Sequence, residues 1–533
     1  MISIKKALAL PFREHVVMLF FLFAILLPYP LFLFFIAKFH SVYCILMAIH
    51  CFLLAYIVTL LVGLIKNKAI RSVVQYMVVF LAAVLFALNV YCLVEFQGLL
   101  DVDYLMLILN TNVNEAREFL TSVLRKSILF SVGGVFLFFY VLWLLSRHYH
   151  LGIESKWCIP VLFLLVVLLV VNPKYWKIWR DGPVFHISYL LYSIPKYQIP
   201  DDLDLGNNTN PDITFNVEYE RPANMILIIG ESFSRSHSSL YGYNMPTNPR
   251  LGALKDSTML FTFDSIEASD GRTSKALQLM LGLCTRIDLL NEDKKWYEYT
   301  TLIEVMHESG YDSYWYSNQE RTGMYNAAGR VLAQSCNHVS FSSNKGYSIF
   351  DEALVDSSYQ TVHQMDSGYY FVIYHLMGSH FDYSSRYPKK FEFFSENDYT
   401  NREKDQRKIV ATYDNSILYN DYVVEQIINL FRHKEAVIVY LPDHGQDMFE
   451  SSPDYFMHGK HNDPVSWSWG LRIPFMVYAS PLYQKHYPDV IKRFQERQNH
   501  PKPWNSEDLP YFIMDLIGLQ TINGEAVKSR SVL

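Results

Sequence analysis

Residues 224–240 read NMILIIGESFSRSHSSL, and this stretch leads from an apolar run to an acidic residue. Met225 to Ile229 is the apolar run, and Gly230 ends it. Such a run is typical of a buried strand in a parallel sheet, where ligands collect at the carboxyl ends of strands. Glu231 is therefore expected at the position of a metal ligand or a catalytic carboxylate.

A second stretch has the same design. The apolar run Ala436 to Leu441 is followed closely by Asp443 and His444. Together with Glu231, these residues give two carboxylates and an imidazole, a ligand set that suits zinc or another borderline divalent cation. The sequence therefore predicts a catalytic metal site at one edge of a sheet, with room for substrate.

Apolar residues are unevenly distributed along the 533 residues. The first third is dense in Leu, Phe, Val and Ile, whereas the rest has the composition of an ordinary soluble protein. The formal net charge of -6 gives no sign of nucleic-acid affinity. These features predict a membrane domain joined to a soluble catalytic domain.

Five segments of the first third are long and apolar enough to span a bilayer. They are residues 16–37, 42–64, 73–95, 128–146 and 157–172. Basic residues precede the first segment and join the second to the third and the fourth to the fifth, which places these connections in the cytoplasm. An odd number of spans puts the rest of the chain across the membrane, on the side that is the periplasm in a Gram-negative bacterium.

The domains follow from this layout. Residues 1–195 are expected to form the helical membrane domain, residues 196–220 a polar linker, and residues 221–533 the periplasmic catalytic domain. Residues 101–126, with apolar side chains at helical spacing, predict an amphipathic helix on the outer membrane surface. Residues 173–180 place two tryptophans among basic residues, a pattern typical of an interfacial anchor.

The C-terminal part alternates apolar runs with helical patterns, which predicts an α/β domain with a mostly parallel sheet. The predicted strands are residues 225–229, 313–316, 369–375, 436–441 and 474–478. The predicted helices include residues 274–283, 301–309 and 413–431. Cys284 and Cys336 are the cysteines of this part, and both a disulfide between them and two free thiols fit their exported location.

Residues 270–277, DGRTSKAL, supply a candidate nucleophile. Gly271 ends an irregular segment, and Thr273 stands where a helix is expected to start. A hydroxyl there meets the amides and the positive end of the helix, which favours an alkoxide and an incoming phosphate. Coordination to a metal would lower the pKa of the hydroxyl further. Taken alone, this motif fits an ordinary N-cap residue better.

Four histidines follow strands or lie near the Asp443 loop. His375 and His380 occur in YHLMGSHFDY, and His458 and His461 occur in MHGKHNDP. Each of them taken singly fits a hydrogen-bonded structural histidine. We expect His380 and His458 to hold a second metal, a phosphate oxygen or the leaving group, because they share a sheet edge with Asp443. His375 is expected to pack at the end of its strand, and His461 has no assigned role.

Seven motifs in chain order carry a resemblance to a known family. They are NMILIIGES, LYGYNMPTNPRL, DGRTSKALQLML, YHLMGSHFDY, YDNSILYNDYVV, LPDHG and MHG. This set resembles the membrane-bound phosphoethanolamine transferases that decorate bacterial lipopolysaccharide, within the alkaline phosphatase and sulfatase superfamily. The likeness covers nearly the whole chain, and the segment LNTNVNEAREFL and the five-span layout resemble the branch that acts on the heptose of the inner core.

The resemblance implies a zinc enzyme of the bacterial inner membrane, with four residues that bind the metal: Glu231, Thr273, Asp443 and His444. It implies that Thr273 carries phosphoethanolamine covalently between two half-reactions. The donor would be phosphatidylethanolamine, and the acceptor would be lipopolysaccharide, at lipid A or an inner-core sugar phosphate. His380 and His458 match family positions that contact substrate or a further zinc ion.

The nucleophile segment departs from the pattern of the lipid A branch. That branch carries a Gly-Thr-x-Thr segment with disulfides nearby, whereas this chain has Gly-Arg-Thr-Ser and no flanking cysteine pair, so Ser274 is a rival to Thr273. The segment also resembles the GKTS of lipoteichoic acid synthases, and a phosphoglycerol transferase acting on a periplasmic glycan is therefore an alternative function. A non-catalytic membrane sensor that keeps the fold is a second alternative.

Overall fold

The computed structural model describes two compact units, Met1–Gln198 and Ile199–Leu533. The described residues are 4–102, 157–170, 182–197, 211–216, 220–290, 294–319, 327–342, 350–458 and 463–533, apart from positions 37, 39, 96, 97 and 454, together with isolated positions between these ranges. Each unit buries a hydrophobic core of its own.

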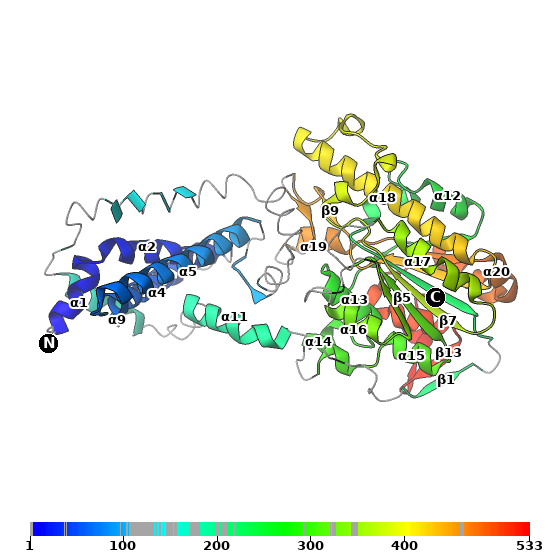
Figure 1. Ribbon diagram of the computed structural model, residues 1–533, viewed down its shortest axis with the longest axis horizontal. Coiled ribbons are helices and arrows are strands. Elements are labelled where there is room, and N and C mark those ends of the chain that lie inside the picture. Colours follow the sequence, from blue (N-terminus) through cyan, green and yellow to red (C-terminus); the bar gives the residue numbers. More distant parts are fainter. Residues whose placement is uncertain are drawn as a thin grey trace. The chain divides into compact units, whose positions relative to one another are not determined.

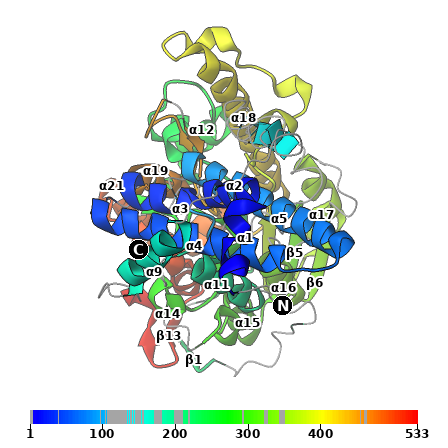
Figure 2. The ribbon, with the colours of Figure 1, turned by 90° about the vertical axis from the view of Figure 1, so that its left-hand side faces the viewer.

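The N-terminal unit is a bundle of apolar helices. Its α-helices within the described ranges are α1 Ile4–Arg13, α2 Val16–Leu26, α3 Pro28–Leu31, α4 Ser41–Gly63, α5 Lys68–Glu95, α9 Cys158–Val170 and α11 Pro183–Tyr197. Helix α4 packs against α2, α5 and α9 (Figures 1 and 2), and apolar side chains fill the space between them.

Three segments of the described chain are long and apolar enough to cross a membrane. They are Val16–Phe35, Ser41–Gly63 and Lys68–Leu93, in agreement with the first three predicted spans. Residues 128–146 lie mostly outside the described ranges. The fifth predicted span corresponds to α9, whose 13 residues are fewer than the roughly 20 that cross a bilayer. The count of five therefore stays a prediction.

Of the remaining predictions for the membrane part, the described residues test only the one for the linker. Apart from three positions near its start, residues 101–126 lie outside the described chain, and so do residues 173–180. Within the expected linker, Ile213–Phe215 forms strand β1, which pairs antiparallel with β13 (Leu519–Ile522). Three residues are too few to show the alternation that marks a strand, which explains why this one was missed.

The C-terminal unit is built around a seven-stranded sheet with the strand order β3-β11-β8-β2-β7-β5-β6. The strands are β2 Asn224–Gly230, β3 Leu260–Phe263, β5 Asp312–Ser317, β6 His338–Phe341, β7 Tyr370–His375, β8 Ala436–Pro442 and β11 Phe475–Ala479. Strands β8, β2, β7, β5 and β6 pair in parallel, whereas β11 runs antiparallel to both its neighbours. The predicted mostly parallel sheet is confirmed.

The two faces of the sheet bury separate cores. In β2, Met225, Leu227 and Ile229 enter one core, and Ile226 and Ile228 enter the other, because successive side chains of a strand point to opposite faces. The first face is covered by α13 Thr273–Leu281, α15 Leu302–Glu308 and α16 Ala327–Gln334 (Figure 1), and also by α21 Pro488–Asn499 and α22 Leu509–Leu516. The second face is covered by α12 Pro249–Asp256, α17 Glu352–Gln364 and α18 Lys404–Phe431 (Figure 1).

Strands β3 and β6 were not among the predicted strands, and two further details differ from the expectations or decide between them. Helix α18 begins at Lys404 and not at residue 413, because its first residues are mostly polar and were not recognised as helical. Cys284 and Cys336 are buried free thiols, so the alternative of two free thiols holds.

Candidate metal and nucleophile site

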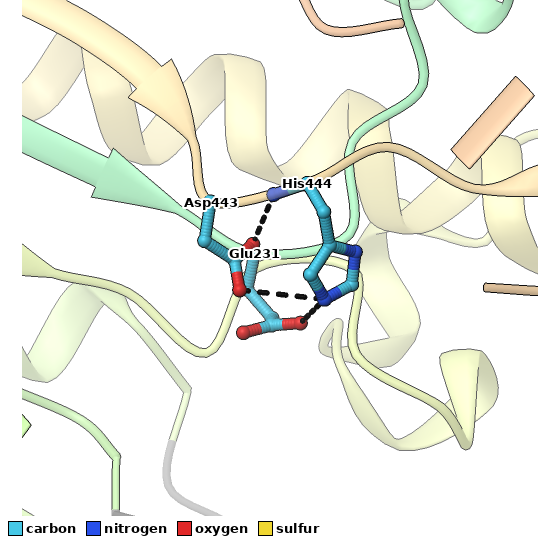
Figure 3. A group of neighbouring side chains, drawn as sticks. All are labelled: Glu231, Asp443 and His444. Atoms are coloured by element: carbon cyan, nitrogen blue, oxygen red, sulfur yellow. Dashed lines mark hydrogen bonds and ion pairs between the residues drawn. The ribbon is translucent and has the colours of Figure 1, made fainter. Parts of the chain in front are cut away.

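Two adjacent strands bring the predicted acidic ligands together. Strands β2 and β8 pair in parallel with Gly230 opposite Pro442, so the residues that follow them emerge at one edge of the sheet. His444 Nε2 lies 3.2 Å from Glu231 Oε1 and 3.3 Å from Asp443 Oδ2 (Figure 3). All three side chains are buried.

The candidate nucleophile reaches the same place from a helix start. Thr273 is the first residue of α13, as predicted, and its Oγ1 lies 3.2 Å from Glu231 Oε2 and 3.3 Å from His444 Nε2. The neighbouring Ser274 instead accepts a hydrogen bond from Gln278, one turn further along the helix. Of the two rival hydroxyls, the structure therefore brings Thr273 to the acidic ligands.

The hydrogen bond of His444 Nδ1 leaves Nε2 as the ring nitrogen that can bind a cation once its proton is displaced. His444 Nδ1 lies 2.8 Å from the carbonyl oxygen of Gly445, which can only accept, so Nδ1 carries the hydrogen. Metal-binding histidines commonly donate their other N–H to such a carbonyl. The lone pair of Nε2 then faces Glu231 and Asp443.

The arrangement of the three candidate ligands suits a divalent cation. Among the described residues, Asp443 Oδ2 is buried and accepts no hydrogen bond. One ligand atom each from Glu231, Asp443 and His444 lie within 4.8 Å of one another. A buried carboxylate oxygen that accepts no hydrogen bond costs free energy, and a cation between these atoms would offset that cost.

The charges of the three groups depend on one another. Burial alone would raise the pKa of Glu231, but His444 outweighs it and lowers the pKa below its ordinary value. Burial and the Glu231 carboxylate raise the pKa of Asp443. Burial would lower the pKa of His444, but the two carboxylates raise it to about 9. A positive charge between the carboxylates relieves their repulsion, and a divalent cation can supply it in place of the His444 proton.

The two predicted accessory histidines also lie at this edge. The His458 ring centroid is 4.0 Å from that of His444, and His458 Nδ1 is 2.8 Å from Gln446 Oε1. His380 Nδ1 is 2.6 Å from the carbonyl oxygen of Phe381. Burial lowers the pKa of both His380 and His458, so each ring is neutral with its hydrogen on Nδ1. Each Nε2 therefore carries a lone pair for a metal or a proton.

The other two histidines are placed differently. His375 is buried against the edge of Trp315, with ring centroids 5.7 Å apart, and burial lowers its pKa to about 4. It is a packed residue at the end of β7, as expected. His461 lies outside the described residues.

Several residues that shape the site were not identified from the sequence. Gly378 has a φ of +53°, and a Cβ at this position would lie 2.8 Å from the backbone nitrogen and oxygen of Glu231. Gln446 holds His458, and Asp351 accepts the amide hydrogens of Met377 and Gly378, both at 2.9 Å. The glycine in YHLMGSH was a usable signal for a close backbone contact, whereas Asp351 gave none.

The family assignment follows from this fold and from the matching sequence. The model of the Sulfatase family matches residues 223–519, more than half of the chain, and the chain belongs to this family. The resemblance to phosphoethanolamine transferases is also confirmed. Phosphoethanolamine transferase EptC of Escherichia coli K12 is 25% identical over 482 residues, which cover 85% of this chain and 81% of that protein. Phosphoethanolamine transferase EptA of Helicobacter pylori is 24% identical, covering 74% of each chain.

Solved structures agree with these relatives. The C-terminal periplasmic domain of EptC from Escherichia coli, in complex with Zn, matches with a TM-score of 0.54 and 26% identity, covering 60% of this chain and 89% of that chain. The integral membrane protein lipooligosaccharide phosphoethanolamine transferase A from Neisseria meningitidis matches with a TM-score of 0.65 and 16% identity, covering 98% of both chains. The second match shows that both units share the fold of a membrane protein.

Proposed function

We propose that this chain is a phosphoethanolamine transferase that moves phosphoethanolamine from phosphatidylethanolamine to lipopolysaccharide, at lipid A or an inner-core sugar phosphate. The phosphoethanolamine transferases among its relatives support this reaction. The single observation that carries it is the position of Thr273 Oγ1, 3.2 Å from Glu231 Oε2 and 3.3 Å from His444 Nε2. A hydroxyl at a helix start, beside a ligand set for a cation, suits attack on a phosphorus atom.

The membrane helices suit a lipid donor. We infer that the chain is a multi-pass protein of a bacterial inner membrane, with its N-terminus in the cytoplasm and its C-terminal unit in the periplasm. The apolar helices and the basic residues between the predicted spans support this placement. Tethering the catalytic unit to the bilayer keeps it near a donor that does not leave the membrane.

Zinc is the proposed metal. Its ligands would be Glu231, Thr273, Asp443 and His444, and the Zn complex of the EptC domain supports this choice. A bound zinc ion would lower the pKa of the Thr273 hydroxyl and stabilise negative charge on the phosphoryl oxygens.

In the first half-reaction, Thr273 takes up the phosphoethanolamine group. Thr273 Oγ1 attacks the phosphorus of the donor, the phosphorus–oxygen bond to diacylglycerol breaks, and diacylglycerol leaves with the hydroxyl proton. The start of α13 directs backbone amides toward the incoming phosphate. Glu231 Oε2, which accepts the hydrogen bond of the Thr273 hydroxyl, keeps the oxygen aimed at the site.

The second half-reaction removes the phosphoethanolamine group from Thr273. An acceptor oxygen of lipopolysaccharide attacks the phosphorus, the bond to Thr273 Oγ1 breaks, and the hydroxyl regains a proton. His380 and His458 are neutral, with an unprotonated Nε2, so either can take the acceptor proton or hold a second zinc ion. With a hydroxyl or a singly protonated phosphate as acceptor, the two half-reactions together neither consume nor release a proton, whereas a fully ionised phosphate acceptor requires one proton from solvent.

Mass spectrometry of lipopolysaccharide tests this function. Gram-negative cells that lack the gene are compared with cells that express the wild-type chain or Thr273→Ala. We expect one added phosphoethanolamine mass that requires the wild-type chain and is absent with Thr273→Ala. An added phosphoglycerol on a glycan would favour the phosphoglycerol transferase instead. Unchanged lipopolysaccharide and glycans, together with a wild-type chain that binds no zinc, would favour the non-catalytic sensor.

A further inference from the structure

Helix α18 places a row of buried polar side chains beneath the site. Tyr413, Ser416 and Asn420 are three and four residues apart, so they lie on one face of the helix. Ser416 Oγ is hydrogen-bonded to Ser379 Oγ at 2.9 Å, and Asn420 Oδ1 accepts from the hydroxyl of Tyr440 at 3.0 Å. This row contacts the turn after β7 and the strand β8.

Tyr413 contacts the turn that carries Glu231. Its hydroxyl donates to the carbonyl oxygen of Ser232 at 2.7 Å and accepts from the amide of Ser234 at 2.8 Å. A tyrosine hydroxyl has one hydrogen to donate, and its oxygen can also accept one. The Tyr413 hydroxyl therefore bridges two backbone groups of this turn. The ring is buried, with its centroid 4.9 Å from that of Tyr383.

Ser232 links this turn to both acidic ligands. Its hydroxyl donates to Glu231 Oε1 at 2.7 Å, and its amide donates to Asp443 Oδ1 at 3.3 Å. Its backbone lies in the left-handed region, with a φ of +55°, which a residue other than glycine adopts only where its surroundings hold it. A rotation of the backbone at Ser232 would therefore move the groups that orient both carboxylates.

We propose that Tyr413 is a positioning residue for the metal ligands, which fixes the backbone of Ser232 and, through it, the carboxylates of Glu231 and Asp443. This inference rests on the metal site of the proposed function. In the described chain, Tyr413 makes no hydrogen bond to a carboxylate oxygen of Glu231 or Asp443. Its effect on these oxygens passes through Ser232. Substitution of a residue that orients a metal ligand commonly lowers the metal affinity by about 10 to 100-fold.

Zinc affinity of Tyr413→Phe tests the inference. This variant removes the hydroxyl and keeps the buried ring. The matched control is Tyr374→Phe in β7, which also loses a buried hydroxyl with a 2.8 Å hydrogen bond, to Ser358, but leaves the Glu231 turn untouched. Zinc affinity is measured on the full chain in detergent by competition with a chelating dye. Unfolding of the zinc-free proteins in urea is measured in parallel.

The expected result is a zinc dissociation constant raised about 10 to 100-fold in Tyr413→Phe and unchanged in Tyr374→Phe, with similar unfolding midpoints for the two variants. Equal zinc affinity of Tyr413→Phe and the wild type would overturn the inference, and so would an equal loss of affinity in both variants. A wild-type chain that binds no zinc would instead overturn the metal site of the proposed function, and the inference with it.

Discussion

Two clusters of one histidine and two carboxylates, buried apart from the partly exposed Glu450, come from neighbouring stretches of the sequence and differ in their hydrogen bonds. In the first, Glu231, Asp443 and His444 converge on Thr273, and Asp443 Oδ2 accepts no hydrogen bond from the described residues. In the second, His237 Nδ1 is 2.6 Å from Asp414 Oδ1.

The second cluster is saturated by protein groups. His237 Nε2 is 3.3 Å from Glu450 Oε1, and Asp414 Oδ2 accepts hydrogen bonds from the hydroxyls of Tyr243 and Tyr399. The carboxylates raise the pKa of His237 to about 9, the same value as for His444. A raised histidine pKa therefore does not distinguish a ligand site from a structural ion pair. What separates the two clusters is that Asp443 Oδ2, whose contact is the ion pair with His444, accepts no hydrogen bond in the described chain, whereas both oxygens of Asp414 accept one.

The largest expected effect is the loss of transfer in Thr273→Ala. Removal of the attacking oxygen should lower the rate of phosphoethanolamine transfer by about 10⁴-fold or more, since the remaining groups cannot replace a nucleophile. The matched control is Ser274→Ala, which should transfer at nearly the wild-type rate. Transfer is measured with labelled phosphatidylethanolamine in vesicles. A Ser274→Ala variant as inactive as Thr273→Ala would contradict the assignment.

Substitution of a carboxylate in the second cluster should lower the stability of the protein. Asp414→Asn leaves a buried His237 with only part of its negative partner, and it should lower the free energy of unfolding by about 3–5 kcal/mol. Asp443→Asn in zinc-free protein should have little effect or stabilise, because it removes a carboxylate that repels Glu231. Urea unfolding with a chelator present measures both variants. The distinction between the clusters fails if Asp443→Asn is the more destabilised of the two.

The pH dependence of stability should follow His237. Burial would lower its pKa, but Asp414 and Glu450 raise it to about 9, above the value near 6.5 of the unfolded chain. Its contribution, about 3 kcal/mol, is fully present below pH 6.5 and is lost as the pH rises through 9. The difference in stability between wild type and His237→Gln, measured from pH 6 to 10, should shrink along this range. A constant difference would show that His237 is uncharged in the folded protein.

The smallest expected effect concerns the support of His458. Gln446→Leu removes the acceptor of the His458 Nδ1 hydrogen, so the ring can turn or change tautomer. Transfer should fall about 10 to 100-fold, while stability changes less than in Asp414→Asn. Steady-state kinetics of the purified full chain provide the measurement. Wild-type kinetics in this variant would indicate that His458 takes no part in the reaction.

Local sequence patterns were sufficient for five of the seven strands of the central sheet and for the candidate ligands that they position, but β3 and β6 were missed. The runs before Gly230 and Asp443 are continuous and apolar, so the strand ends, and with them Glu231 and His444, could be placed without a structure. Thr273 was placed by a helix start, a signal contained within a few residues. In these cases, the feature that decides the structure is short and contiguous.

Contacts between distant segments could not be predicted in this way. Tyr413 and Ser232 are 181 residues apart in sequence, and nothing in the helical pattern of α18 distinguishes a tyrosine that packs from one that bonds to a turn. The same holds for His237 and Asp414, 177 residues apart. A single sequence carries no signal for such pairs, because they depend on how the helix lies across the sheet.

The most direct test of the account is the mass of the Thr273 peptide. The purified full chain is incubated with zinc and phosphatidylethanolamine vesicles in the absence of acceptor, quenched and digested. The account predicts one added phosphoethanolamine group on Thr273, which disappears when lipopolysaccharide is supplied. Transfer to lipopolysaccharide without any modified Thr273, or with the group on Ser274, would contradict it.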